Sequence, residues 1–228
     1  MASGQRAADD DRRLAGWLGF VVLFSTLSYG SNLAAEETGP EEPLYESSFF
    51  VSILFGLGLM VGVALLVAIG VRKRDLFALR RPRSWPRAAG ISFLVLVGIV
   101  VLSGLVSPFI DPGGEQGLLP EDWPPPDAAV FALNAAAVVV GAPLAEELLF
   151  RGVGQSLFER FGSIAAIVVP SAGWAASHGL LEAFPIIFAL GLGLGMLRRS
   201  SGSVVPGMIL HGVFNAIALV GAAVGASG

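Results

Sequence analysis

The chain has 228 residues, of which 54% are hydrophobic and 14% are charged, and its mean hydropathy is +0.73. Soluble domains are roughly 45–50% apolar and about 25% charged, so this composition excludes an ordinary soluble domain and predicts an all-α polytopic bundle of transmembrane helices. The net charge is −4, and the chain contains no cysteine, which excludes disulfides and thiolate metal sites.

The N-terminal segment resembles a signal peptide in one respect, since Arg6, Arg12 and Arg13 precede an apolar run. Three consecutive aspartates dilute this positive charge, however, and no small-x-small cleavage site follows, so we predict a first membrane helix instead. Apolar runs of the required length predict about seven helices, near 15–34, 48–71, 88–108, 128–158, 163–179, 184–197 and 203–223. Gly141 and Pro143 should kink or split the fourth helix.

The loops between these helices alternate in charge. Residues 72–87 carry seven of the 14 basic residues, whereas residues 36–46 and 111–127 each carry five acidic residues and no basic one. The positive-inside bias therefore places loop 72–87 and the N-terminus in the cytoplasm and the two acidic loops outside. We expect a multi-pass protein of the plasma membrane, with residues 111–127 as a stiff, proline-rich outer linker.

Two adjacent glutamates and an arginine occur within the fourth apolar run. Residues i and i+4 share a helix face, so Arg151 is predicted to pair with Glu147 and to leave Glu146 free. A carboxylate in a poorly solvated place suits a general acid or base. The alternative assignment, in which Arg151 pairs with Glu146, stays open because the two lie five residues apart, and a purely structural ion pair is a third possibility.

The two histidines of the chain both lie in apolar runs, where ionisable groups are costly and usually functional. His178 follows Trp174 by four residues, so indole and imidazole share a face. His211 precedes Asn215 by four residues, and together they offer two donors to one point, as an oxyanion requires. Hydrogen bonding between helices is the alternative for this second pair.

Glu-Glu-x3-Arg, aromatic-x3-His and His-x3-Asn on successive helices resemble the CPBP family of intramembrane proteases. That family includes the CAAX prenyl endopeptidases of the Rce1 type and the bacteriocin-processing proteins of the Abi type. The resemblance covers about residues 128–220 and implies that Glu146 activates a water molecule beside His178, while His211 and Asn215 line the oxyanion hole. Glu147 and Arg151 would support the glutamate helix, and Trp174 stands where the family more often has phenylalanine. On this basis residues 1–127 are a tail and three helices with acidic outer loops, and residues 128–228 are the catalytic bundle.

Several points stay open at this level. Glu146, His178 and His211 could supply three zinc ligands, although the resemblance to Rce1-type enzymes favours a metal-free mechanism. The expected partners are the lipid bilayer and a peptide or membrane-anchored protein substrate, and no nucleic acid is expected. Prenylated C-termini, leader peptides and membrane-protein segments all remain as substrate classes. A proton-coupled transporter and a non-catalytic immunity or scaffold protein are the rival functions. Glu146 falls in the inner half of its helix and His178 near the outer end of its own, so the side to which the site opens is not predicted.

Overall fold

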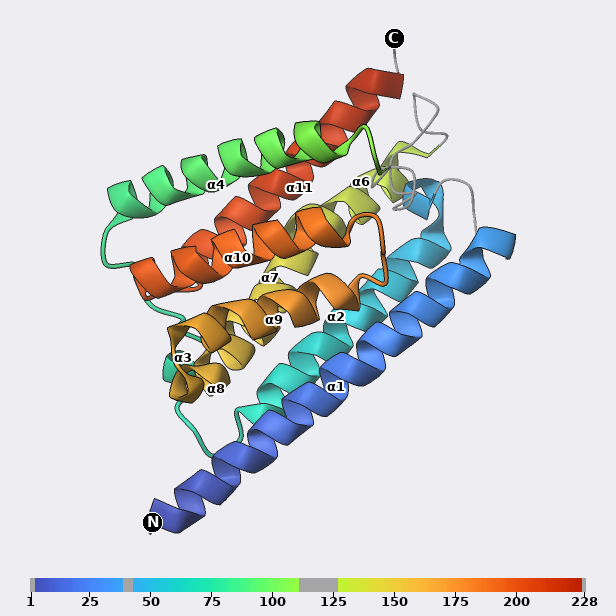
Figure 1. The fold of residues 1–228 in the computed structure, drawn as a ribbon. Helices are drawn as coiled ribbons and strands as arrows, with labels where there is room; N and C mark the ends of the chain where they lie inside the picture. Colours follow the sequence, from blue (N-terminus) through green and yellow to red (C-terminus); the bar gives the residue numbers. More distant parts are fainter. Residues whose placement is uncertain (1–2, 39–42, 111–126, 227–228) are drawn as a thin grey trace.

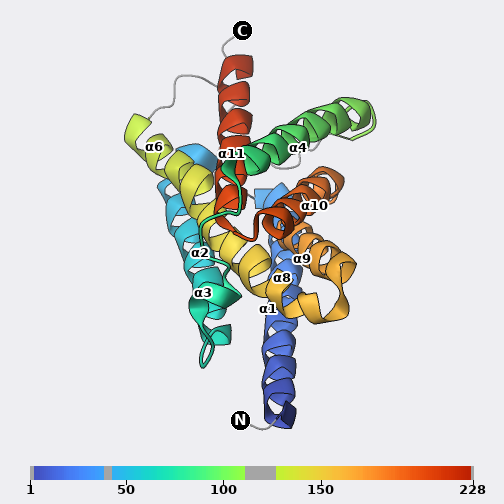
Figure 2. The same cartoon turned by 90° about the vertical axis from the view of Figure 1, so that its left-hand side faces the viewer.

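The computed structural model describes residues 3–38, 43–110 and 127–226, and these residues form helices without any strand (Figures 1 and 2). The all-α prediction is confirmed. The long single helices are α1 (Ser3–Thr38), α2 (Ser47–Val67), α4 (Trp85–Val106), α9 (Ser163–Ser177), α10 (Phe184–Ser201) and α11 (Val205–Ala226). Short helices are η1 (Pro43–Tyr45) before α2 and α3 (Lys73–Leu76) in the basic loop. Nearly all of the linker predicted for residues 111–127 lies outside the described residues.

The fourth predicted helix is a composite that stays helical from Ala128 to Phe161. Its segments are α6 (Ala128–Ala136), η2 (Ala137–Gly141), α7 (Ala142–Glu146), η3 (Glu147–Gly154), α8 (Gln155–Phe158) and η4 (Glu159–Phe161). The helix is not split at Pro143. Instead, π-helical turns at η2 and η3 flank the short α7, and such turns are frequent at functional sites. The helix is therefore irregular near Gly141 and Pro143, as predicted, but the irregularity consists of π-helical turns rather than a break.

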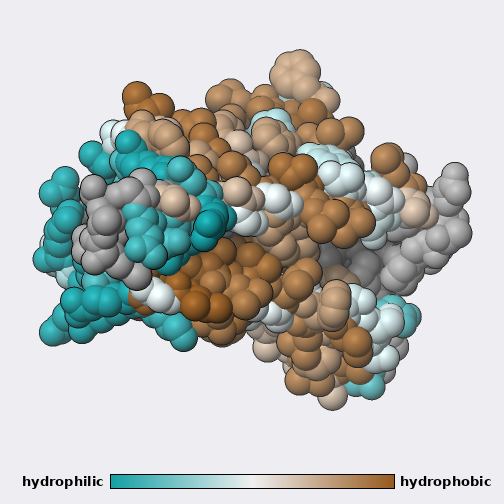
Figure 3. Space-filling view, turned by 90° about the horizontal axis from the view of Figure 1, so that it is seen from below, coloured by the Kyte–Doolittle hydropathy of each residue, from teal (hydrophilic) through white to brown (hydrophobic). Residues whose placement is uncertain are grey.

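Four helices of the described part are long and apolar enough to cross a membrane, namely Ala8–Ala34, α2, α4 and the composite helix. Figure 3 shows a broad hydrophobic belt with hydrophilic residues gathered at one end of the molecule. In Figure 1 this end holds the N-terminus, α3 and the turn between α10 and α11, whereas the C-terminus and the start of α2 lie at the other end. We call the first the basic end, since it contains loop 72–87, and the second the opposite end.

The helices share one core, in which α10 packs against α9 and α4, and α1 packs against α9. Trp17 of α1 is fully buried, and its indole N–H donates to the Leu149 carbonyl at 3.0 Å. A Cβ added to Gly154 would lie 2.6 Å from the Trp17 ring, so only glycine permits this approach. The core thus contains residues from both sides of the predicted division at residue 127, and the first helix helps to hold the composite helix in place.

Candidate active site

Glu147 and Arg151 form a closed ion pair inside the bundle. The Arg151 Nη1 and Glu147 Oε1 atoms are 2.9 Å apart, and the two side chains are 1% and 0% exposed. Arg151 also donates to the Gly191 carbonyl at 3.3 Å, and its guanidinium lies 4.3 Å from the centre of the Trp174 ring. The pairing that the i, i+4 spacing predicts is therefore present, and Glu147 is committed to it.

Glu146 points elsewhere. Its Oε2 accepts a hydrogen bond of 2.5 Å from the Trp174 indole N–H, and the residue lines a cavity of about 370 Å³. Phenylalanine has no such donor. Trp174 stands where the family that the motifs resemble more often has phenylalanine. This difference is more than an exchange of one aromatic ring for another, because the indole N–H places a hydrogen bond on the candidate catalytic carboxylate.

His211 lies between the two glutamates. Its Nε2 is 3.9 Å from Glu146 Oε2 and its Nδ1 is 3.7 Å from Glu147 Oε1, and its ring meets Trp174 edge to face with centroids 5.0 Å apart. Both nitrogen–oxygen distances exceed the length of a direct hydrogen bond. Between His211 and Glu146, which both line the cavity, there is room for a bridging water molecule.

His178 reaches the same cavity from the end of α9. Its Nδ1 is 2.8 Å from the Trp174 carbonyl oxygen, and the two rings are 5.2 Å apart. Because a carbonyl oxygen only accepts, Nδ1 must carry the hydrogen, which leaves Nε2 as an acceptor in the neutral ring. Both His178 and Glu146 line the cavity, and both contact Trp174. The two side chains therefore meet although the sequence predicted them at different depths. The composite helix is not broken at Pro143, and α9 begins at Ser163 as predicted.

Asn215 has a structural bond as well as a place in the cavity. Its Nδ2 donates to the Val138 carbonyl at 2.9 Å. In an α-helix residue 143 would donate to the Val139 carbonyl, and in a π-helical turn to that of Val138, but Pro143 has no N–H. Asn215 therefore satisfies a carbonyl that this proline leaves free. The amide has a second N–H, and Asn215 lines the cavity together with His211.

The cavity is mostly apolar, with Phe49, Ile53, Ile187 and Phe214 among its lining residues. Leu44 of η1 and Ala183 of the α9–α10 turn also line it, and both segments lie at the opposite end of the bundle. The candidate site is thus a polar cluster at the base of an apolar cavity that extends away from the basic end.

Two asparagines that support the cavity were not singled out in the sequence. Asn32 of α1 donates to the carbonyls of His178 and Gly179, at 3.1 and 3.2 Å, and Gly179 has a left-handed φ of +71°. Asn134 of α6 donates to the carbonyls of Leu44 and Glu46, each at 3.0 Å. Both asparagines are polar residues within or beside apolar runs, which is the signal that could have identified them.

The three candidate zinc ligands do not form a metal site as they stand. Over residues 3–38, 43–110 and 127–226, no three His, Cys, Asp or Glu side chains are grouped closely enough to hold a metal ion. The Oε2 of Glu146 accepts from Trp174, the Nδ1 of His178 faces a carbonyl, and His211 lies 3.9 Å from Glu146. We therefore assign no step to a metal.

Comparison with known proteins gives the family. Residues 128–217 match the family model named Rce1-like, whose description is "Type II CAAX prenyl endopeptidase Rce1-like". No curated protein and no solved structure matches the chain. The matched segment contains the composite helix, α9, α10 and the part of α11 that carries His211 and Asn215. The resemblance seen in the motifs is thus confirmed: residues 128–217 of this membrane helix bundle are similar to the Rce1-like family of type II CAAX prenyl endopeptidases.

Proposed function

We propose that the chain is an intramembrane endopeptidase in which Glu146 activates the attacking water. One observation carries this assignment: Glu146 lines the cavity, while the adjacent Glu147 is held by Arg151 and fully buried. Only the first of the two carboxylates can therefore meet a substrate. Among the described residues its one side-chain hydrogen bond comes from Trp174, which stabilises the charge without neutralising it.

In the proposed mechanism a water molecule lies between Glu146 and His211, whose facing atoms are 3.9 Å apart. Glu146 takes a proton as the water oxygen attacks the peptide carbonyl. A ring N–H of His211 and the remaining amide N–H of Asn215 donate to the oxyanion of the tetrahedral intermediate. Glu146 then returns its proton to the leaving amine, so that the carboxylate is regenerated when the C–N bond breaks.

The cavity also supports a substrate class. Its aromatic and aliphatic lining favours an apolar or lipid-modified peptide segment presented within the bilayer. Because the cavity extends away from the basic end, and basic loops usually face the cytoplasm, we propose that it opens toward the outer leaflet. This orientation favours membrane-anchored and secreted peptides over C-termini presented from the cytoplasm.

The test is an assay with the purified protein in lipid nanodiscs and a peptide library that includes farnesylated and unmodified sequences, read by mass spectrometry. We expect cleavage by the wild type and a 10²–10⁴-fold loss for Glu146→Gln, the usual effect of removing a positioned base. Glu46→Gln, an exchange of the same kind at an exposed position, should cleave as the wild type does. Retention of more than a tenth of the activity by Glu146→Gln would overturn the mechanism, and ion accumulation in vesicles without any cleavage would favour a transporter.

A further inference from the structure

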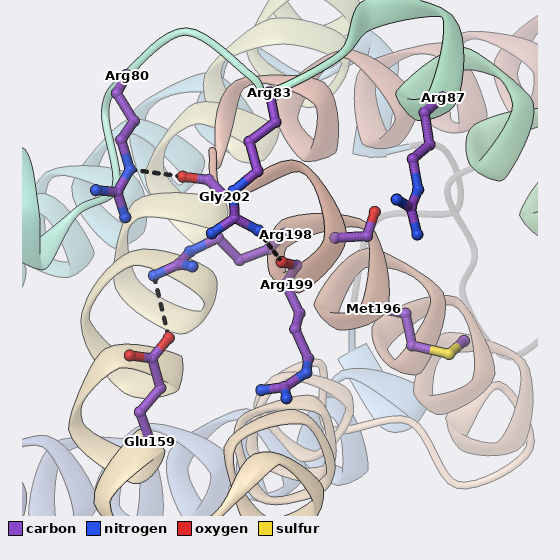
Figure 4. Close-up of a pocket in the computed structure, with 9 residues that line it drawn as sticks. Arg80, Arg83, Arg87, Glu159, Met196, Arg198, Arg199 and Gly202 are labelled. Carbon is purple, nitrogen blue, oxygen red and sulfur yellow. Dashed lines mark hydrogen bonds and ion pairs between the residues drawn. The ribbon is translucent and has the colours of Figure 1, made fainter.

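A second cavity lies at the basic end, far from the proposed active site. Its volume is about 740 Å³, and its charged lining residues are Arg80, Arg83, Arg87, Arg198, Arg199 and Glu159. Figure 4 shows Arg83 and Arg198 between Arg80 on one side and Arg87 on the other. Five guanidinium groups thus surround the space with one carboxylate, and that carboxylate is 3.6 Å from Arg198. The arginine cavity, as we call it, has an excess of positive charge that its own residues do not balance.

The arginine cavity is held in place by backbone hydrogen bonds rather than by flexible side chains alone. The Arg83 N–H donates to the Ser201 carbonyl at 2.9 Å, and the Val204 N–H donates to the Ala78 carbonyl at 3.2 Å. The Arg80 Nε donates to the carbonyl of Gly202, at 2.7 Å. The loop before α4 is therefore joined to the turn between α10 and α11 before any ligand arrives.

One arginine of this set is itself buried. Arg198 is 4% exposed, and its Nη2 donates to the Ser156 hydroxyl at 3.1 Å. Its Nε has no hydrogen-bond partner in the part of the chain that the structure describes. A buried cation with an unsatisfied donor beside four other cations is costly. Glu159, 3.6 Å from the Arg198 Nη2, is the one carboxylate that lines the cavity, and it leaves the Nε without a partner. Guanidinium groups match the oxygens of a phosphate in geometry and in charge.

The arginine cavity lies where a candidate membrane span begins. That span is α4, which starts at Trp85, and the cavity-lining residues Arg83 and Arg87 lie just before and just after this start. A headgroup bound in the cavity would therefore be at the membrane–water boundary of α4.

We propose that the arginine cavity binds an anionic phospholipid, with the phosphate headgroup among the five arginines. A neutral lipid would leave the charge of these arginines unbalanced, and the position of the cavity at the start of a membrane span favours a lipid over a soluble phosphate. Trp85, which is 43% exposed at the start of α4, is a residue type enriched at the membrane–water interface. Basic pockets at the cytoplasmic side of membrane helices are suited to anionic headgroups.

The test is native mass spectrometry of the purified full chain in detergent, titrated with phosphatidylglycerol, phosphatidylcholine or glycerol phosphate. We expect phosphatidylglycerol to bind at least tenfold more tightly than either of the other two. Arg87→Gln combined with Arg199→Gln should lower its affinity about tenfold or more, since both side chains are exposed and neither donates to the loop–turn contacts.

Arg72→Gln combined with Arg74→Gln is the matched control, because these exposed arginines of the same loop do not line the cavity. Thermal melting without lipid establishes that each variant is folded, and Arg87→Gln alone replaces the double variant if that one unfolds. Equal binding of the two phospholipids, an equal loss in the control, or binding of glycerol phosphate as tight as that of phosphatidylglycerol would each overturn the proposal.

Discussion

Two polar regions lie side by side in the middle of this bundle and differ in packing. Glu146 opens onto a cavity of about 370 Å³, whereas a Cβ added to Gly207 would lie 2.6 Å from the carboxylate of Glu147. The two glutamates are neighbours in the chain, but successive helical residues point about 100° apart. One turn of helix thus presents one acid to the cavity and commits the other to the packed core. Changes in the cavity should lower turnover, and changes in the core should lower stability.

The strongest test of the core side is Arg151→Ala. Removing one partner of a buried ion pair costs about 3–5 kcal/mol, because the other charge stays buried and unpaired. We expect a loss of this size in the free energy of unfolding, measured by denaturant titration in detergent micelles. Arg160→Ala, which removes a partly exposed pair with Asp11, should cost at most about 1 kcal/mol. An unchanged stability of Arg151→Ala would show that the core pair is solvated.

The cavity side is tested by His211→Ala, Asn215→Ala and the double variant. Loss of one oxyanion donor lowers kcat by about 10²–10³-fold. Because the two residues serve one oxygen, the double variant should lose less than the product of the single losses. A rise in KM with kcat intact would instead assign both residues to substrate binding.

Asn215→Ala sharpens the comparison, since this residue belongs to both regions. It leaves the Val138 carbonyl without a partner, so we expect it also to lower stability by about 1–3 kcal/mol. The measurement is the melting temperature of Asn215→Ala compared with that of His211→Ala. Equal melting temperatures of these two variants would contradict the structural role of Asn215.

A smaller effect is expected from Gly207→Ala. The added methyl group would displace the Glu147 carboxylate, and overpacking in a well-packed core costs about 1–3 kcal/mol. Gly221→Ala in the same helix is the control, because nothing lies within 4 Å of its added Cβ. The melting temperature should fall for the first variant and stay equal or rise slightly for the second, given the better helix propensity of alanine. Equal behaviour of the two would show that the core has room to adjust.

The smallest effect concerns Asn32, which supports the cavity from α1. Asn32→Ala removes two hydrogen bonds to the turn at His178, worth about 1 kcal/mol each. We expect a modest loss of both stability and kcat, because His178 is no longer held. Thr26→Ala, which removes only a bond within α1, is the control. A loss of stability with kcat unchanged would show that the position of His178 does not matter for turnover.

The helices were predictable because their signal is local. Each predicted apolar run corresponds to an observed helix, although several helices, α1 most of all, extend beyond the predicted ends. Four of the described helices, rather than seven, are long and apolar enough to cross a membrane. The pairing of Glu147 with Arg151 was predictable for the same reason, since i, i+4 spacing is a property of one helix. The contact of Trp17 with Leu149 was not predictable, because 132 residues separate the two and no pattern in the sequence connects them.

The sequence by itself determined the membrane-helix class, the charge difference between the loops and the set of polar residues on three helices, because composition and spacing within a helix decide these. Only the tertiary structure decided that Trp174 donates to Glu146, that Asn215 satisfies the carbonyl freed by Pro143, and that five arginines from separate segments surround one cavity. Each of these depends on how one helix is placed and rotated against another. That placement follows from close packing over the whole core, and no single segment of the chain contains it.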